Sequence, residues 1–119
     1  MADLEPRNFV QPCLLLLLYE QPDHGYELAA RLSPMCVGDP GGAGGVYRAL
    51  RGLERRGLVA SRWEPSAIGP ARRTYHITDR GLGVLDHHAR ELQRTHEALH
   101  VFLERYSRLC PAPARTREA

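Results

Sequence analysis

The chain has no lysine, because all sixteen of its basic residues are arginine. A Walker-type phosphate loop carries a lysine that reaches the β- and γ-phosphates, so the glycine-rich segment 38–45 is not expected to be one. A dinucleotide-binding loop needs a hydrophobic strand before it, and the preceding SPMCV contains a proline. The sequence therefore predicts no nucleotide cofactor.

Long apolar runs and closely spaced cysteines are also missing. The longest apolar run, CLLLLLY at 13–19, is far shorter than the roughly 20 residues that cross a bilayer, and no signal-peptide pattern precedes it. We therefore expect no membrane partner and no export. The cysteines, Cys13, Cys36 and Cys110, show no C-x-x-C spacing and leave one unpaired in any disulfide scheme, which favours a cytoplasmic location.

No arrangement of catalytic or metal-binding residues stands out, so an enzyme is not predicted. Four histidines lie near the C-terminus: His87, His88, His96 and His100. His96 and His100 are one helical turn apart, but no carboxylate or cysteine completes a metal site at short spacing. A pH-sensitive contact between two copies of His96 is the favoured alternative. Cys36 has no basic neighbour in sequence that would stabilise a thiolate and make it a redox switch.

What the chain does contain is a basic middle. Its overall formal charge is only +2, yet residues 41–80 carry eight arginines against three acidic residues, a net charge of +5. Such a distribution indicates a surface that meets a polyanion, although arginines can also form a solvated face.

Helical periodicity appears in three segments of the N-terminal half. A helix predicted from Pro12 to Glu20 is apolar on nearly every side and needs cover on several faces. A second is predicted over 26–32, and a third over about 44–56, ended by Gly57. The third helix has an apolar stripe with arginines on another face: Arg48, Arg51 and Arg55.

The C-terminal half predicts a hairpin and one long helix. Segments 58–63 and 72–78 read as two strands with arginines at the base of the hairpin, and Thr78 can cap a helix over 79–109. That helix, ~40 Å from residue 82 to 108, is too long for one small domain to cover, so a second copy is expected. Written as a heptad repeat, the helix has Leu85, Leu92, Leu99 and Tyr106 at position d and Leu82, Ala89, His96 and Leu103 at position a. The predicted dimer interface consists of Leu85, Ala89, Leu92, His96, Leu99, Leu103 and Tyr106.

These elements together predict a mainly α fold with a small β-hairpin wing, a winged helix-turn-helix followed by one long C-terminal dimerisation helix. The expected boundaries are 1–78 for the DNA-binding domain, 79–109 for the dimerisation helix and 110–119 for a flexible tail.

Three quoted segments resemble the PadR family of bacterial transcriptional regulators: LLYEQPDHGYELAARL, GGVYRALRGLERRGLVASRW and RRTYHITDRGLGVL. The resemblance covers roughly residues 10–86. Because only one helix is predicted after the wing, the chain is similar to the short-tailed subgroup of the family. It implies a homodimeric repressor that binds a near-palindromic operator in double-stranded DNA. The third helix would enter the major groove and the wing would contact the backbone. It also implies release by a small aromatic or drug-like effector.

Carried over to this sequence, the resemblance implies that Tyr47 and Arg48 face the DNA. It places Arg72 and Arg73 at the basic foot of the wing. Gly44 and Gly45 stand where the family commonly has a small hydroxyl residue, so phosphate contacts there would come from backbone N–H groups. The predicted DNA-binding residues are Gly44, Gly45, Tyr47, Arg48, Arg51, Arg55, Arg72 and Arg73.

Two alternatives stay open at this point. Trp63 is expected to pack in the core under the wing, and the alternative is an aromatic wall for a planar effector. A winged-helix module that binds a protein rather than specific DNA is the alternative function. Salt separates the two functions, because DNA binding through several arginines weakens steeply as salt rises.

Overall fold

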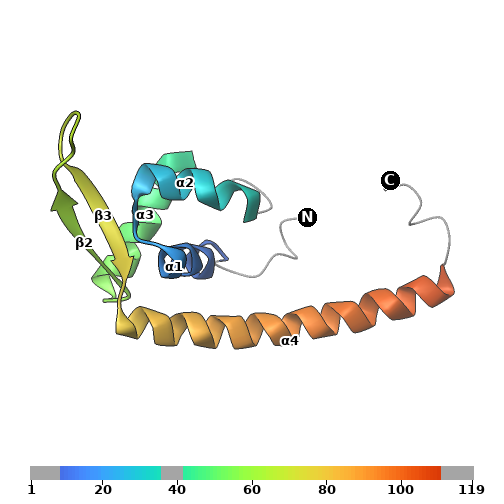
Figure 1. Ribbon diagram of the computed structural model, residues 1–119. Coiled ribbons are helices and arrows are strands. Elements are labelled where there is room, and N and C mark those ends of the chain that lie inside the picture. Colours follow the sequence, from blue (N-terminus) through green and yellow to red (C-terminus); the bar gives the residue numbers. More distant parts are fainter. Residues whose placement is uncertain (1–8, 36–41, 111–119) are drawn as a thin grey trace. The chain divides into compact units, whose positions relative to one another are not determined.

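The computed structural model describes residues 9–35 and 42–110 (Figure 1). Cys36, the start of the glycine-rich connector and the tail from residue 111 lie outside the described residues. The chain divides into two compact units between Asp86 and His87. The elements in order are α1 (Val10–Glu20), β1 (Asp23–His24), α2 (Gly25–Leu32), a 3₁₀ turn (Ser33–Met35), α3 (Gly42–Arg55), β2 (Val59–Glu64), β3 (Arg72–Ile77) and α4 (Asp79–Leu109). The predicted mainly helical fold with a small wing is confirmed.

Helix α1 lies at the centre of the core. Its buried residues are Pro12, Cys13, Leu14, Leu15, Leu17 and Leu18. Neighbouring positions on a helix point in different directions, so their joint burial requires cover on several sides, and α2, α3 and β3 provide it. The prediction that this helix needs cover on several faces is confirmed.

Helix α3 is bounded by glycines at both ends. At its C-terminus Gly57 has a φ of 77°, and its N–H donates to Glu54 O at 3.0 Å while that of Leu58 donates to Leu53 O at 3.0 Å. This is a Schellman motif, which needs the left-handed conformation that glycine adopts without strain, so the predicted role of Gly57 is confirmed. At its N-terminus the helix starts at Gly42, slightly before the predicted start at about residue 44, and Gly44 and Gly45 lie within its first turns.

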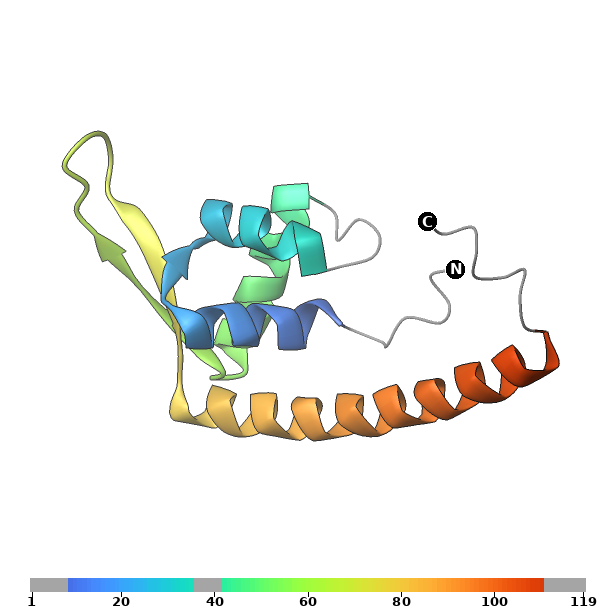
Figure 2. The ribbon, with the colours of Figure 1, turned by 45° about the vertical axis from the view of Figure 1, so that its right-hand side comes forward.

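The sheet has three antiparallel strands in the order β1-β3-β2, one more than predicted. The hairpin of β2 and β3 forms the wing beside α3 (Figures 1 and 2). The additional strand, β1, pairs Asp23 with Tyr75. Arg31 of α2 anchors it, because this guanidinium donates to Asp23 Oδ2 at 2.9 Å and to the carbonyl of Leu17 in the last turn of α1 at 2.8 Å.

The wing connects to α4 through a tight joint. The hydroxyl of Thr78 donates to Gly57 O at 2.7 Å and accepts the N–H of Gly81 at 3.0 Å, so Thr78 caps the helix as predicted. A Cβ at Gly81 would overlap the carbonyl oxygen of Leu58 and lie 2.8 Å from Ile77 Cγ1. Glycine is therefore required for this close approach of the first turn of α4 to the wing.

Candidate nucleic-acid interface

Helix α3 turns an apolar side to the core and a basic side to solvent. Val46, Leu50 and Leu53 are buried in the core. Arg48, Arg51 and Arg55 are exposed, as their spacing predicts. No residue in the described ranges 9–35 and 42–110 forms an ion pair with any of these three arginines. Their charges are therefore available to an external anion.

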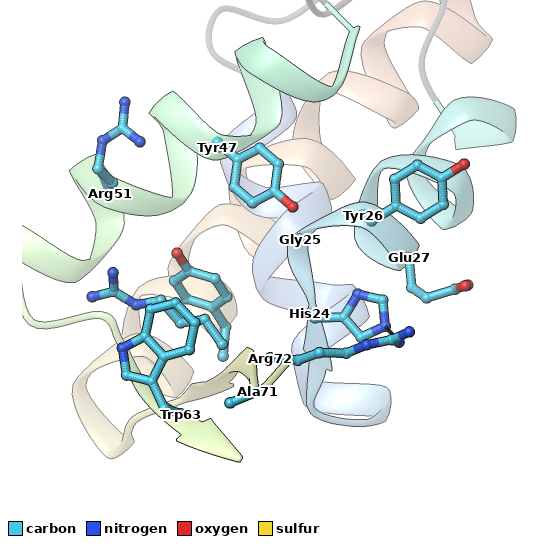
Figure 3. Close-up of a pocket in the computed structure, with 11 residues that line it drawn as sticks. His24, Gly25, Tyr26, Glu27, Tyr47, Arg51, Trp63, Ala71 and Arg72 are labelled. Atoms are coloured by element: carbon cyan, nitrogen blue, oxygen red, sulfur yellow. Dashed lines mark hydrogen bonds between the residues drawn. The ribbon is translucent and has the colours of Figure 1, made fainter. Parts of the chain in front are cut away.

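Tyr47 joins the two motifs that carry the family resemblance. Its ring lies over the backbone of Gly25 at the start of α2, where an added Cβ would overlap Tyr47 Cε1 and stand 2.7 Å from Cζ. Only glycine leaves room for this packing. Tyr47 as a whole is still 37% exposed, so the contact positions it on the outer side of α3 (Figure 3).

The arginines of the wing do not lie where we expected. The register pairs Arg72 with Glu64 and Arg73 with Trp63, at the end of the ladder next to the hairpin loop, whereas Val59 and Ile77 pair at the base. The prediction of arginines at the base is therefore wrong. The hairpin loop spans residues 65–71, so Arg72 is the first residue after it, a position that the predicted strand over 72–78 already implied.

Arg73 is held by the protein itself. Its Nε donates to Ser61 Oγ at 2.9 Å, and its Nη2 lies 3.5 Å from Glu54 Oε1. The guanidinium carbon also lies 5.8 Å from the ring centroid of Trp63 and 5.9 Å from that of Tyr75, within the range of cation–π attraction. Burial raises the pKa of Tyr75, and the nearby charge of Arg73 partly opposes this rise. Arg73 thus ties the wing to α3.

Two other wing arginines have looser partners. Arg62 forms an ion pair with Glu64 at 3.1 Å, with 71% of its side chain exposed. Arg72 Nη1 lies 3.0 Å from His24 Nε2 in β1, a bond in which the imidazole nitrogen accepts. Exposed pairs of this kind contribute roughly 0–1 kcal/mol, so an incoming phosphate can replace them at little cost.

A groove of about 580 Å³ between α2, α3 and the wing contains half of the predicted DNA-binding residues (Figure 3). Four predicted DNA-binding residues line it: Tyr47, Arg51, Arg72 and Arg73. The others are not brought into it: Gly44, Gly45, Arg48 and Arg55. Sequence reasoning missed His24 and Tyr26, which also line the groove. The signal that could have found them is the HGYEL motif itself, read together with the VYRAL motif that packs on it.

Trp63 is not a core residue. It is 65% exposed and lines the groove, so the expectation that it packs under the wing is wrong. The aromatic side chain of the wing that packs into the core is instead that of Tyr75, which is 2% exposed. The strand pairing explains the difference, because the Trp63 position lies near the hairpin loop and beyond the helices that could cover it.

Metal and membrane binding find no support in the described part of the chain. Within residues 9–35 and 42–110, no three side chains of the histidine, cysteine or carboxylate type come together to hold a metal ion. Among the helices of the same residues, none combines the length and the apolar character of a membrane span.

Comparison with known proteins identifies the fold. Residues 14–87 match the model of the transcriptional regulator PadR-like family. The chain belongs to this family. No curated protein matches it.

Solved structures agree with the PadR family assignment. A crystal structure described as a conserved protein of unknown function and a potential transcriptional factor is 33% identical, with a TM-score of 0.74 over 88% of this chain and 96% of that chain. A PadR-like transcriptional regulator from Bacillus cereus is 26% identical, with a TM-score of 0.67 over 79% of this chain and 90% of that chain. PadR of Bacillus subtilis, crystallised with operator DNA, shares the fold at 19% identity and a TM-score of 0.57, over 65% of this chain and 44% of that chain.

Proposed function

We propose that the protein is a cytoplasmic, homodimeric PadR-like repressor that binds a near-palindromic operator. In this proposal α3 enters the major groove and the wing contacts the adjacent backbone. Two copies of α3 would be presented about one DNA turn, ~34 Å, apart. Repression would follow from blocking the access of RNA polymerase to the promoter.

The observation that carries the proposal is the exposed basic side of α3. Arg48, Arg51 and Arg55 have no ion-pair partner in the described ranges, while the opposite side of the same helix is locked into the core. A solubilising role would not require three cations to share one side of a helix beside a basic wing. A rigid helix with unpaired arginines is the form of element that reads base edges in the major groove.

The second half of the proposal is the dimer. Residues 99–109 of α4 expose large apolar side chains: Leu99, Val101, Phe102, Leu103, Tyr106 and Leu109. A contiguous exposed apolar surface of this kind indicates an interface. We propose a second copy of α4 as its cover, with the residues from Leu85 to Tyr106 that the heptad predicts as the seam.

An electrophoretic shift with the DNA upstream of the protein's own gene, at two salt concentrations, tests the proposal. Wild type should bind tightly, and affinity should fall steeply with salt. Arg48→Ala/Arg51→Ala should weaken binding at least roughly tenfold, since a lost base contact costs about 1–3 kcal/mol.

The matched control is Arg94→Ala/Arg108→Ala, which removes the same charge from exposed sites of α4 that the heptad places away from the seam. It should leave DNA affinity within about twofold of wild type. No specific shift of wild type at low salt would instead favour the protein-interaction module. An equal loss in both double variants would show that only net charge matters.

Release by a small aromatic effector belongs to the same proposal, with Trp63 as its candidate contact. Its support is the exposed indole in a groove that also holds arginines. Addition of small aromatic acids to the preformed complex tests it, because an effector lowers the fraction of bound DNA and changes Trp63 emission. A compound series without either change would remove this element.

A further inference from the structure

The groove between α2, α3 and the wing contains more exposed aromatic surface than the fold needs. Tyr26 is 68% exposed and Trp63 is 65% exposed, and they enter the groove from α2 and from the wing (Figure 3). Single exposed apolar side chains are common on protein surfaces, but several gathered in one groove mark a binding site. Tyr75 already fills the core beneath, so neither ring is required for packing there.

The indole of Trp63 is contacted by Arg73 before any ligand arrives. Arg73 lies against the indole, and Arg73 is itself fixed by Ser61 and Glu54. Ser61 Oγ also donates to Glu54 Oε2 at 2.7 Å, which connects β2 to α3. A bound group that packs on the indole therefore pays little for ordering this side chain.

The charge of the groove selects an anion. Its lining contains three arginines, Arg51, Arg72 and Arg73, and one carboxylate, Glu27. Arg73 is engaged by Glu54. Among the described residues, Arg51 has no ion-pair partner, and the guanidinium of Arg72 has a single hydrogen-bond partner, the imidazole of His24. Arg51 and Arg72 are thus the cations that can meet an incoming anion. Alternation of cations with exposed rings suits a chain that alternates phosphates with apolar faces.

We propose that this groove seats one strand of the DNA backbone, with Trp63 packed against a deoxyribose and Arg51 and Arg72 on the neighbouring phosphates. The inference rests on the proposed function, because a strand that runs from the α3 contact to the wing contact must pass between them. It changes the roles predicted from sequence. Trp63 becomes a DNA-positioning residue, and Arg73 supports Trp63 rather than binding phosphate itself.

Backbone contacts of this kind have a distinct signature in binding experiments. An apolar contact releases no counterion, so Trp63→Ala should weaken binding about 5- to 100-fold through lost apolar burial, with an unchanged slope of log affinity against log salt. It should do so equally for operator and unrelated duplexes, because a deoxyribose carries no sequence information. Arg72→Ala should instead reduce the magnitude of the slope by about one.

The experiment uses the full chain, a duplex from upstream of its own gene and an unrelated duplex of equal length. Trp63 is the only tryptophan, so its emission reports on the groove alone, and it should change on saturation with either duplex. Trp63→Phe keeps a flat apolar ring and should restore most of the affinity. Thermal unfolding of each variant shows that the fold is intact.

Four results would overturn the inference. Affinity of Trp63→Ala equal to that of wild type, or unchanged emission at saturation, would place the DNA elsewhere while leaving the repressor proposal standing. A loss confined to the operator duplex would make Trp63 a base reader. Absence of DNA binding by wild type would remove the proposed function together with the inference.

Discussion

The two units of the chain differ in where their apolar side chains lie. In the unit that ends at Asp86, leucines from α1, α2 and α3 are fully buried around one core. In the helix beyond it, every residue from 89 to 110 is exposed except Leu92, which is partly buried. One unit is thus stabilised by its own chain, and we infer that the other needs a partner. An isolated helix gains little stability in water without a packed apolar side.

The difference separates two kinds of stability. Unfolding of the first unit should not depend on protein concentration, because its core lies within one chain. Order in the distal part of α4 should depend on concentration, because its apolar surface is covered only on association. The effect of a mutation on stability should therefore depend on protein concentration when the mutation lies in the distal part of α4, and should not when it lies in the first unit.

The largest expected effect is on the proposed dimer. Leu99→Ala/Leu103→Ala removes four leucines per dimer, at roughly 1.5–3 kcal/mol each, so the dissociation constant should rise by about four orders of magnitude or more. Sedimentation over a range of concentrations measures this change. Trp63 emission should stay that of wild type, and Arg94→Ala/Arg108→Ala should remain dimeric. A double leucine variant that stays dimeric would move the interface away from α4.

Next in size is the loss of a core side chain. Leu50→Ala should lower the free energy of unfolding by about 2–5 kcal/mol, because Leu50 is fully buried in α3. Leu109→Ala is the matched control: Leu109 is 82% exposed and should change the stability of the first unit by less than about 0.5 kcal/mol. Urea unfolding followed through Trp63 emission compares them. Equal losses would contradict the division into two units.

The smallest effect is a contrast between two glycines. Gly25→Ala should cost about 1–3 kcal/mol, because the new methyl group overlaps the ring of Tyr47. A Cβ at Gly52 in α3 meets nothing within 4 Å, so Gly52→Ala should stabilise the helix by about 0.5–1 kcal/mol. Thermal unfolding shows whether each substitution raises or lowers the stability of the protein. A neutral Gly25→Ala would mean that Tyr47 moves aside freely, and its DNA affinity would then show whether the position of that ring matters.

Periodicity and capping predicted the helices because these signals are local. The apolar stripe of α3, the end at Gly57 and the cap at Thr78 each depend on residues within a few positions of one another. The sequence predicts the start of the third helix at about residue 44, whereas α3 already begins at Gly42. Glycine costs about 1 kcal/mol in a helix interior, so local propensity does not set this boundary.

Features that depend on contacts between distant segments were missed. Strand β1 has two residues and no alternation, and it exists through its pairing with β3. The exposure of Trp63 and the anchoring of Arg73 depend on which end of the hairpin each residue occupies. For the candidate site, the arginines on α3 could be read from spacing, whereas the groove could not, because it is made from three separate elements.

Thr78 and Gly81 attach the first turn of α4 directly to the wing. The Thr78 hydroxyl donates to Gly57 O and accepts the N–H of Gly81, so strand β3 and helix α4 are connected without a flexible linker. A rotation of the 31-residue helix by ~5° about its first turn would move its last turn, ~46 Å along the helix axis, by about 4 Å. In the proposed dimer, a small change in how the two α4 helices pair would therefore change the separation of the two α3 helices.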